Sequence, residues 1–242
     1  MAAQLRAIFA LILSAAVIAT PVMAAEPHAD VDYRHQKSWK GVLDHAQSPI
    51  DIVTRSALPA DRKDAGALLI ASRPSAGVVE DNGHAVQVNT DEAEAVIRGR
   101  HFRLTQFHFH SPSEHTFDGK AAPLEGHFVF RAQDGRLAVV GVMFQEGADN
   151  PDIEPVLEQL RRPGHFGQTE IDIARLLPAD KSYYHYLGSL TTPPLTENVE
   201  WYVLAQPVAL GAKQLQELHD RHPHNNRQPQ AMNDRPLVYY PD

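Results

Sequence analysis

The chain has 242 residues and a formal net charge of −8, and it contains no cysteine. This length suits one large domain, especially a β-rich one. The acidic balance, without any cluster of basic residues, disfavours nucleic acid as a partner, because phosphate binding needs a concentrated positive surface. The absence of cysteine excludes thiolate metal sites and cysteine nucleophiles, so any metal must be held by histidine and carboxylate.

The first 25 residues have the pattern of a signal peptide. Arg6 precedes an apolar run over residues 7–19, and the small residues of "VMAA" follow Pro21. A membrane span needs about 20 apolar residues, so cleavage after Ala24 or Ala25 is favoured over retention as an anchor. We therefore expect residues 1–25 to be a leader, residues 26–242 to form one periplasmic or secreted domain, and no stable membrane span to remain.

The sequence beyond the leader is dominated by β patterns. The segment 55–73 is polar and irregular and predicts a surface excursion. Glycine, Asp-Gly or Asn-Gly punctuates short apolar or alternating runs, as strands joined by turns require; these runs cover residues 78–88, 94–110, 125–132, 136–144 and 199–210.

Two amphipathic helices are also predicted. One follows Asn150, with Pro151 in its first turn and apolar residues at Ile153, Val156, Leu157 and Leu160. The other covers residues 211–219, with Leu215 and Leu218 facing inward. Together the patterns predict a single, mainly β (α+β) domain.

Four histidines and two glutamates lie within "FHFHSPSEHTFDGKAAPLEGHFVF", residues 107–130. Side chains on a strand alternate between faces, so His108 and His110 point the same way. A two-residue turn at Asp118-Gly119 would place His110 opposite His127, and His108 opposite Val129. Directly opposed residues have Cβ atoms about 5 Å apart, which suits a shared metal.

The same alternation sorts the remaining residues of this stretch. It places Glu114 and Glu125 on the histidine face and His115 on the other face. Three histidines on two strands would leave a fourth metal position open, which is the arrangement of catalytic zinc. The alternative is three buried histidines satisfied by their neighbours without a metal. Gln106 and Glu125 favour the metal, because they can accept the second ring N–H of a ligand.

Five segments in a fixed order carry a resemblance to a known family: "QSPIDI", "DNGHAVQV", "QFHFHSPSEHTFDGK…LEGHFVF", "YLGSLTTPPLTENVEW" and "NNRQPQAMNDR". They resemble the α-class carbonic anhydrases in their bacterial secreted form, over nearly all of the chain beyond the leader. The resemblance implies a large, twisted, mostly antiparallel central sheet with a few short peripheral helices. It also implies reversible hydration of carbon dioxide to bicarbonate and a proton through a zinc-bound hydroxide, with possible side esterase activity.

The resemblance assigns roles to individual residues. The zinc ligands would be His108, His110 and His127, oriented by Gln106, Glu125 and the backbone carbonyl of Asn225. Thr191 would orient the hydroxide and donate its own proton to Glu114, and His84 would carry protons to solvent. The substrate would contact an apolar wall of Val129, Val139, Leu190 and Trp201, opposite a polar wall of Asn82, Gln87, Gln106 and Thr192.

Two features depart from the family. Secreted members often have a disulfide between the segment before "QSPI" and the loop after "TTPP", whereas Leu195 occupies that loop here. The family's N-terminal tyrosine has no clear counterpart, Tyr33 being the candidate.

Alternative interpretations of the sequence also stay open. His84 could be an ordinary solvent histidine after an Asn-Gly turn, and the wall valines could be ordinary core residues. The whole protein could be a carbonic-anhydrase-like zinc-binding module without fast catalysis. A third function is a His-rich periplasmic zinc store around residues 219–224. A homodimer is one assembly that the resemblance allows.

Overall fold

The computed structural model describes residues 31–242, except for 62, 64–65 and 164–166. The predicted leader, residues 1–25, lies outside the described residues. None of the helices in the described part is long and apolar enough to span a membrane.

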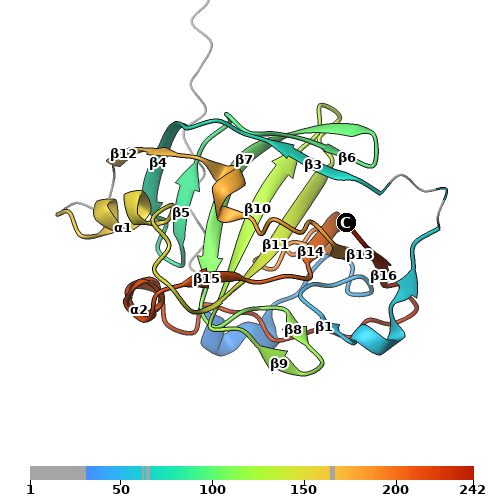
Figure 1. Ribbon diagram of the computed structural model, residues 1–242. Helices are drawn as coiled ribbons and strands as arrows, with labels where there is room; N and C mark the ends of the chain where they lie inside the picture. The colour runs from blue at the N-terminus through green and yellow to red at the C-terminus, as the bar shows by residue number, and fades with distance from the viewer. Residues whose placement is uncertain (1–30, 62, 64–65, 164–166) are drawn as a thin grey trace, which may run out of the picture.

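A large twisted sheet of 13 strands runs through the molecule in the order β12-β4-β5-β7-β10-β11-β14-β13-β16-β2 (Figure 1). β15 pairs with β11 at the side of this path, and β6 links β3 to β7. The strands are β2 (Leu58–Pro59), β3 (Leu68–Ala71), β4 (Ser75–Asp81), β5 (Val86–Asn89), β6 (Glu94–Ile97), β7 (Arg100–His110), β10 (Leu124–Arg131), β11 (Leu137–Glu146), β12 (Gly167–Ile171), β13 (Tyr183–Ser189), β14 (Glu197–Leu204), β15 (Val208–Leu210) and β16 (Val238–Tyr240).

A second, three-stranded sheet joins β1 (Asp51–Ile52), β8 (Thr116–Phe117) and β9 (Lys120–Ala121). Among the described strands most pairs are antiparallel, and the parallel pairs are β11–β14, β11–β15, β16–β2 and β1–β8. The predicted mainly β domain is confirmed. The expectation of an irregular segment at residues 55–73 is wrong over β2, which pairs with β16, and over β3, a four-residue strand that pairs with β6.

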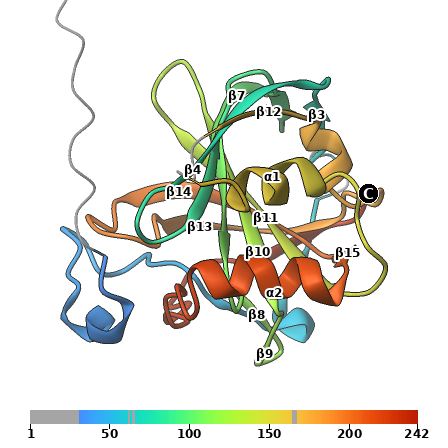
Figure 2. The ribbon, with the colours of Figure 1, turned by 90° about the vertical axis from the view of Figure 1, so that its left-hand side faces the viewer.

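Both predicted helices are present. α1 (Glu154–Leu160) buries Val156, Leu157 and Leu160, although Pro155, rather than Pro151, lies in its first turn. α2 (Ala212–Arg221) begins after Gly211 and buries the predicted leucines. Figure 2 shows both helices on one side of the sheet. The described residues also contain three 3-10 helices: η1 (Tyr33–Ser38), η2 (Thr54–Ser56) and η3 (Ile173–Leu176).

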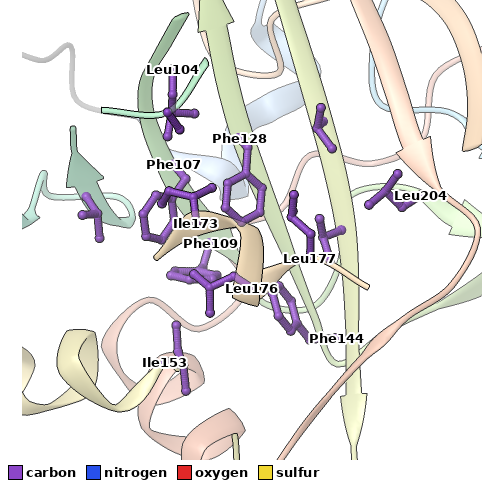
Figure 3. Close-up of a cluster of buried hydrophobic side chains, with 14 of the residues drawn as sticks. Leu104, Phe107, Phe109, Phe128, Phe144, Ile153, Ile173, Leu176, Leu177 and Leu204 are labelled. Carbon is purple, nitrogen blue, oxygen red and sulfur yellow. The ribbon is translucent and has the colours of Figure 1, made fainter. Parts of the chain in front are cut away.

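The main hydrophobic core lies on the face of the sheet that α1, α2 and η3 cover. Phe107 of β7 stacks on Phe128 of β10, with ring centroids 5.1 Å apart, and η3 packs against them (Figure 3). Full burial of each phenylalanine contributes on the order of 1.5–3 kcal/mol. Because side chains alternate along a strand, this packing turns the histidines of β7 and β10 to the opposite face.

The pairing of β7 with β10 differs from the register that the turn predicts. Asp118 and Gly119 both have positive φ, of 48° and 77°, as a tight hairpin turn requires. Beyond the short β8–β9 hairpin, however, five residues (111–115) lead from β7 to β8 while only two (122–123) lead from β9 to β10.

His108 therefore lies opposite His127, and His110 lies opposite Glu125. The predicted pairs His110–His127 and His108–Val129 are wrong. Because the shift is two residues, an even number, each of these side chains stays on its predicted face.

Candidate active site

Three histidines converge on the face of the sheet away from the helices. His108 and His110 come from β7, and His127 comes from the neighbouring strand β10. Their ring centroids lie 4.6–5.3 Å apart, and one nitrogen of each ring lies within 4.8 Å of the other two. The arrangement could hold one metal ion.

One nitrogen of each ring is engaged by an acceptor that cannot donate. His108 Nδ1 donates to Gln106 Oε1 at 2.8 Å, and His110 Nδ1 donates to the backbone carbonyl of Asn225 at 2.6 Å. His127 Nε2 donates to Glu125 Oε1 at 2.9 Å. These bonds fix the tautomer of each neutral ring and leave a lone pair on His108 Nε2, His110 Nε2 and His127 Nδ1.

The free nitrogens match the requirements of a metal. His110 Nε2 is buried and has no hydrogen-bond partner among the described residues. A buried polar atom without a partner costs about 1–3 kcal/mol, and coordination of a cation would remove that cost. Three imidazole ligands with room for a fourth suit zinc in a catalytic role.

A second group, His115, Glu125 and His127, is also close enough to hold a metal. Its atoms, however, satisfy one another. Both His115 Nδ1 and His127 Nε2 donate to Glu125 Oε1. All three side chains are buried, and their polar atoms already bond one another, whereas each ring of the first group keeps one nitrogen available. The first group is therefore the better metal site.

Electrostatics keep the site ready for a cation. Burial, with the neighbouring rings His110 and His127, holds the pKa of His108 well below its usual value. Burial also lowers the pKa of His110. For His127, the nearby Glu125 carboxylate outweighs burial and raises the pKa.

Glu125 is the main support behind these ligands. Its Oε1 accepts from two rings, and its Oε2 accepts from the backbone N–H groups of Glu114 and His115 at 2.8 Å each. Burial alone would raise the pKa of Glu125, but His115 and His127 hold it well below its usual value. The carboxylate is therefore ionised and balances part of the charge of a bound cation.

The alternation of side chains predicts that His115 lies on the face opposite the ligands, and this prediction is wrong. His115 belongs to the irregular segment 111–115, where alternation does not apply, and its ring lies 4.7 Å from that of Trp201. Its Nε2 lies 2.7 Å from the Tyr186 hydroxyl, which in turn bonds Ser48 Oγ at 2.8 Å. A buried polar chain thus connects His127, through Glu125 and His115, to Ser48.

Removing the Glu125 carboxylate should weaken metal binding. In Glu125→Ala, His127 loses its acceptor and two backbone N–H groups lose theirs, so we expect zinc affinity to fall about 10- to 100-fold. Competition with a chromophoric chelator measures this affinity. Glu146→Ala, at the exposed end of β11, is the matched control; an equal affinity for both variants would contradict the supporting role.

Glu114 lies fully buried beside the histidines. Its Oε1 accepts the backbone N–H of Arg227 at 2.7 Å, and its Oε2 has no hydrogen-bond partner among the described residues. Thr191 is also buried, in the loop after β13. A hydrogen bond from Thr191 to Glu114 stays a prediction from the resemblance, with Oε2 as the atom available to accept it.

The Thr191 loop is held without a disulfide. Gln47 Nε2 donates to the Leu195 carbonyl and to Glu197 Oε1, at 3.2 and 3.0 Å. The Ala46 N–H donates to the same carboxylate oxygen at 2.7 Å. These bonds join the two segments that the family disulfide would join.

A pocket of about 210 Å³ opens beside the ligands. Its lining brings together His84, the predicted polar wall and two of the three converging histidines. The lining residues are Val31, Asn82, His84, Gln87, Gln106, His108, His110, Thr192 and Pro193. Asn82 Nδ2 donates to Gln87 Oε1 at 3.0 Å, and Asn82 Oδ1 accepts the His84 N–H, so the turn carrying His84 is fixed to this wall.

The four predicted apolar-wall residues lie on the other side of the ligands. Val129, Val139 and Trp201 occupy one row across β10, β11 and β14, and Trp201 lies 4.8 Å from the His127 ring between centroids. They share a second buried cluster with Leu190. They are absent from the described lining of the pocket, so their contact with substrate stays a prediction.

Two residues near the site escape a reading of the sequence, Arg227 and Gly141. Arg227 is buried, donates to Gln47 Oε1 and the Ser48 carbonyl, and anchors Glu114 through its backbone. Gly141 lies opposite His127, where a Cβ would come within 3.1 Å of Glu125 Oε1. The roles of Arg227 and Gly141 depend on long-range contacts that no local pattern signals. The tyrosine candidate of the sequence, Tyr33, has a buried hydroxyl, and burial followed by the charge of Glu114 raises its pKa.

Comparisons with known proteins agree with this geometry. A family model described as eukaryotic-type carbonic anhydrase matches residues 34–240. A carbonic anhydrase of Pectobacterium atrosepticum is 41% identical over 200 residues, covering 80% of this chain and 79% of the relative.

Two solved structures are also similar. An α-carbonic anhydrase from Thermovibrio ammonificans, in complex with the inhibitor sulfanilamide, is 38% identical with a TM-score of 0.74, over 80% of this chain and 86% of that one. Carbonic anhydrase Cah3 from Chlamydomonas reinhardtii, in complex with acetazolamide, is 32% identical with a TM-score of 0.77, over 89% of this chain and 99% of that one. The chain therefore belongs to the eukaryotic-type, or α-class, carbonic anhydrases and is an enzyme of that family.

Proposed function

We propose that the protein uses Zn²⁺ held by His108, His110 and His127 to catalyse the reversible hydration of carbon dioxide to bicarbonate and a proton. The observation that carries the proposal is the convergence of three ring nitrogens with free lone pairs, one of them buried without a partner. Zinc with three neutral ligands lowers the pKa of coordinated water to about 7 and so supplies a nucleophile at neutral pH.

The side chains around the ligands have separate tasks. The Thr191 hydroxyl accepts a hydrogen bond from the attacking oxygen and donates its own proton to Glu114 Oε2. An ionised carboxylate can only accept, so this direction selects one lone pair for attack. Val129, Val139, Leu190 and Trp201 provide an apolar surface for carbon dioxide, and Thr192 lines the pocket beside it. The same nucleophile would attack an activated ester, as a side reaction.

The proton released in each turnover leaves through His84. This residue lines the same pocket as His108 and His110, so water in the pocket can connect them. Imidazole exchanges protons readily near neutral pH. The turn after β4 therefore presents the proton acceptor at the pocket wall.

Replacing His84 with alanine should slow turnover in weak buffer. Because a positioned acid or base contributes about 10²- to 10⁴-fold, and pocket water partly bypasses the residue, we expect kcat to fall about tenfold. Added imidazole should restore kcat, while kcat/KM stays unchanged. Stopped-flow hydration of carbon dioxide at several buffer concentrations measures both constants, and a buffer-independent loss would show that His84 is not the shuttle.

The alternative functions have less support. The ligand histidines of a carbonic-anhydrase-like binding module are usually lost, and all three are present here. In the described residues, the tail histidines do not form a metal-holding group; instead His219 Nδ1 bonds Ser111 Oγ at 2.9 Å. A zinc store at residues 219–224 is therefore not favoured.

The proposed setting is the periplasm or the exterior, because of the apolar run and small-residue ending in residues 1–25. The leader and a homodimer stay predictions. Activity that scales with zinc content would support the enzyme, whereas zinc-loaded protein without hydration would identify a binding module.

A further inference from the structure

A larger cavity of about 540 Å³ adjoins the pocket of the ligands. His84 and Val31 line both spaces, so His84 stands in the wall between them. The outer cavity lies between η1, the β4–β5 turn and the segment after α2. The outer cavity is therefore one route by which a proton on His84 can reach solvent.

His222 lines this outer cavity and is bonded to a carboxylate, Asp81, behind it. His222 Nε2 lies 2.7 Å from Asp81 Oδ1, and both side chains are mostly buried, at 16% and 21% exposed. The carboxylate can only accept, so Nε2–H donates and His222 Nδ1 is left with a lone pair. This lone pair makes His222 Nδ1 a geometrically available proton acceptor.

The pair is attached to the turn that carries His84. Asp81 Oδ1 also accepts the Gly83 N–H at 3.0 Å. From the other side, Asn225 Nδ2 donates to the His84 carbonyl at 2.9 Å. The segment 222–225 and the His84 turn are thus held together by two independent contacts.

Other charged and titratable groups face the same cavity, from η1 and from the end of α2: Asp32, Tyr33, Arg34, Arg221 and His224. Asp32 is committed to Arg34 and to His35 Nδ1, at 2.9 and 2.8 Å. His222 differs from these groups because it combines an available imidazole nitrogen with a hydrogen bond to a carboxylate, that of Asp81.

We propose that His222, oriented by Asp81, is a second proton-relay residue that receives protons from His84 through water in the outer cavity. In the step, the His84 imidazolium gives up one N–H proton, which reaches His222 Nδ1 along cavity water. His222 then passes the proton to solvent or buffer and returns to its neutral form. The inference rests on the shuttle role proposed for His84.

The test is carbon dioxide hydration by zinc-loaded His222→Asn and Asp81→Asn. In weak buffer, kcat should fall about three- to tenfold in each, less than the 10²-fold or more of direct acid–base catalysis, because cavity water offers a bypass. kcat/KM and zinc content should stay unchanged, and imidazole should restore kcat. His101→Asn, an exposed histidine of β7 outside both cavities, is the matched control.

A double variant distinguishes a relay from a structural effect. In a His84→Ala background, His222→Asn should cause no further loss, because residues in one pathway are not additive. An unchanged kcat in both single variants in weak buffer would overturn the proposal, as would an equal loss with and without His84. If His84→Ala alone has no effect, the shuttle itself fails; if only the His222 and Asp81 variants have no effect, the shuttle stands and the second relay falls.

Discussion

Replacing His127 with alanine is expected to abolish both zinc binding and carbon dioxide hydration. His127 is the ligand that we propose on β10, and the two histidines left on β7 would make an incomplete site. Zinc content should fall from about one ion per chain to nearly none, since catalytic sites need three protein ligands. Without the metal, water returns from a pKa of about 7 toward 15.7, so activity should fall by more than about 10³-fold.

The control for this variant is His101→Ala, which removes an exposed histidine of β7. It should keep both zinc and activity. Elemental analysis and stopped-flow hydration measure the two quantities, and circular dichroism verifies that the variant is folded. A folded His127→Ala protein with full zinc content would contradict the assignment of the ligand.

Replacing Thr191 with alanine is expected to separate activity from metal binding. Thr191 lies in a loop held by Gln47 and Glu197 rather than by the ligands, so zinc content should not change. Loss of orientation at a reacting centre costs about 10²-fold, and we expect kcat/KM to fall by that amount. Thr191→Ser keeps the hydroxyl and should retain most of the activity.

Two results would count against this role of Thr191. Loss of zinc in Thr191→Ala would make the residue structural. Equal losses in the alanine and serine variants would mean that the methyl group, rather than the hydroxyl, matters. The same kinetic assay with parallel zinc analysis distinguishes these cases.

Which side chains of β7 and β10 face the site could be predicted from alternation alone, but the pairing register of the two strands could not. His108, His110 and His127 share a face because side chains alternate along β7 and β10. Which residues oppose one another depends on the unequal segments 111–115 and 122–123 around the β8–β9 hairpin, and their conformation is set by contacts with distant residues. For example, the Ser111 N–H donates to Asn225 Oδ1.

Short and irregular strands also could not be predicted from the sequence. β13 has no clean alternation of buried and exposed residues, and its register shifts at Gly188 and Ser189. β3 buries Leu68 alone among its four residues, so its pattern does not differ from that of a loop. The supporting residues near the proposed ligands differ in how far they lie from them in the sequence. Gln106 and Glu125 lie two positions from a proposed ligand and could be predicted, whereas Arg227 and Tyr186 are far away in the sequence and could not.

We propose that one zinc ion, held by three histidines, supplies the carbonic anhydrase activity of this chain. The most direct measurement strips the protein with a chelator and adds Zn²⁺ back in steps while carbon dioxide hydration is followed. We predict negligible activity in the stripped protein and a linear rise that ends at about one zinc per chain. Full activity without metal, or no recovery after one equivalent has bound, would contradict a single zinc ion at the three histidines.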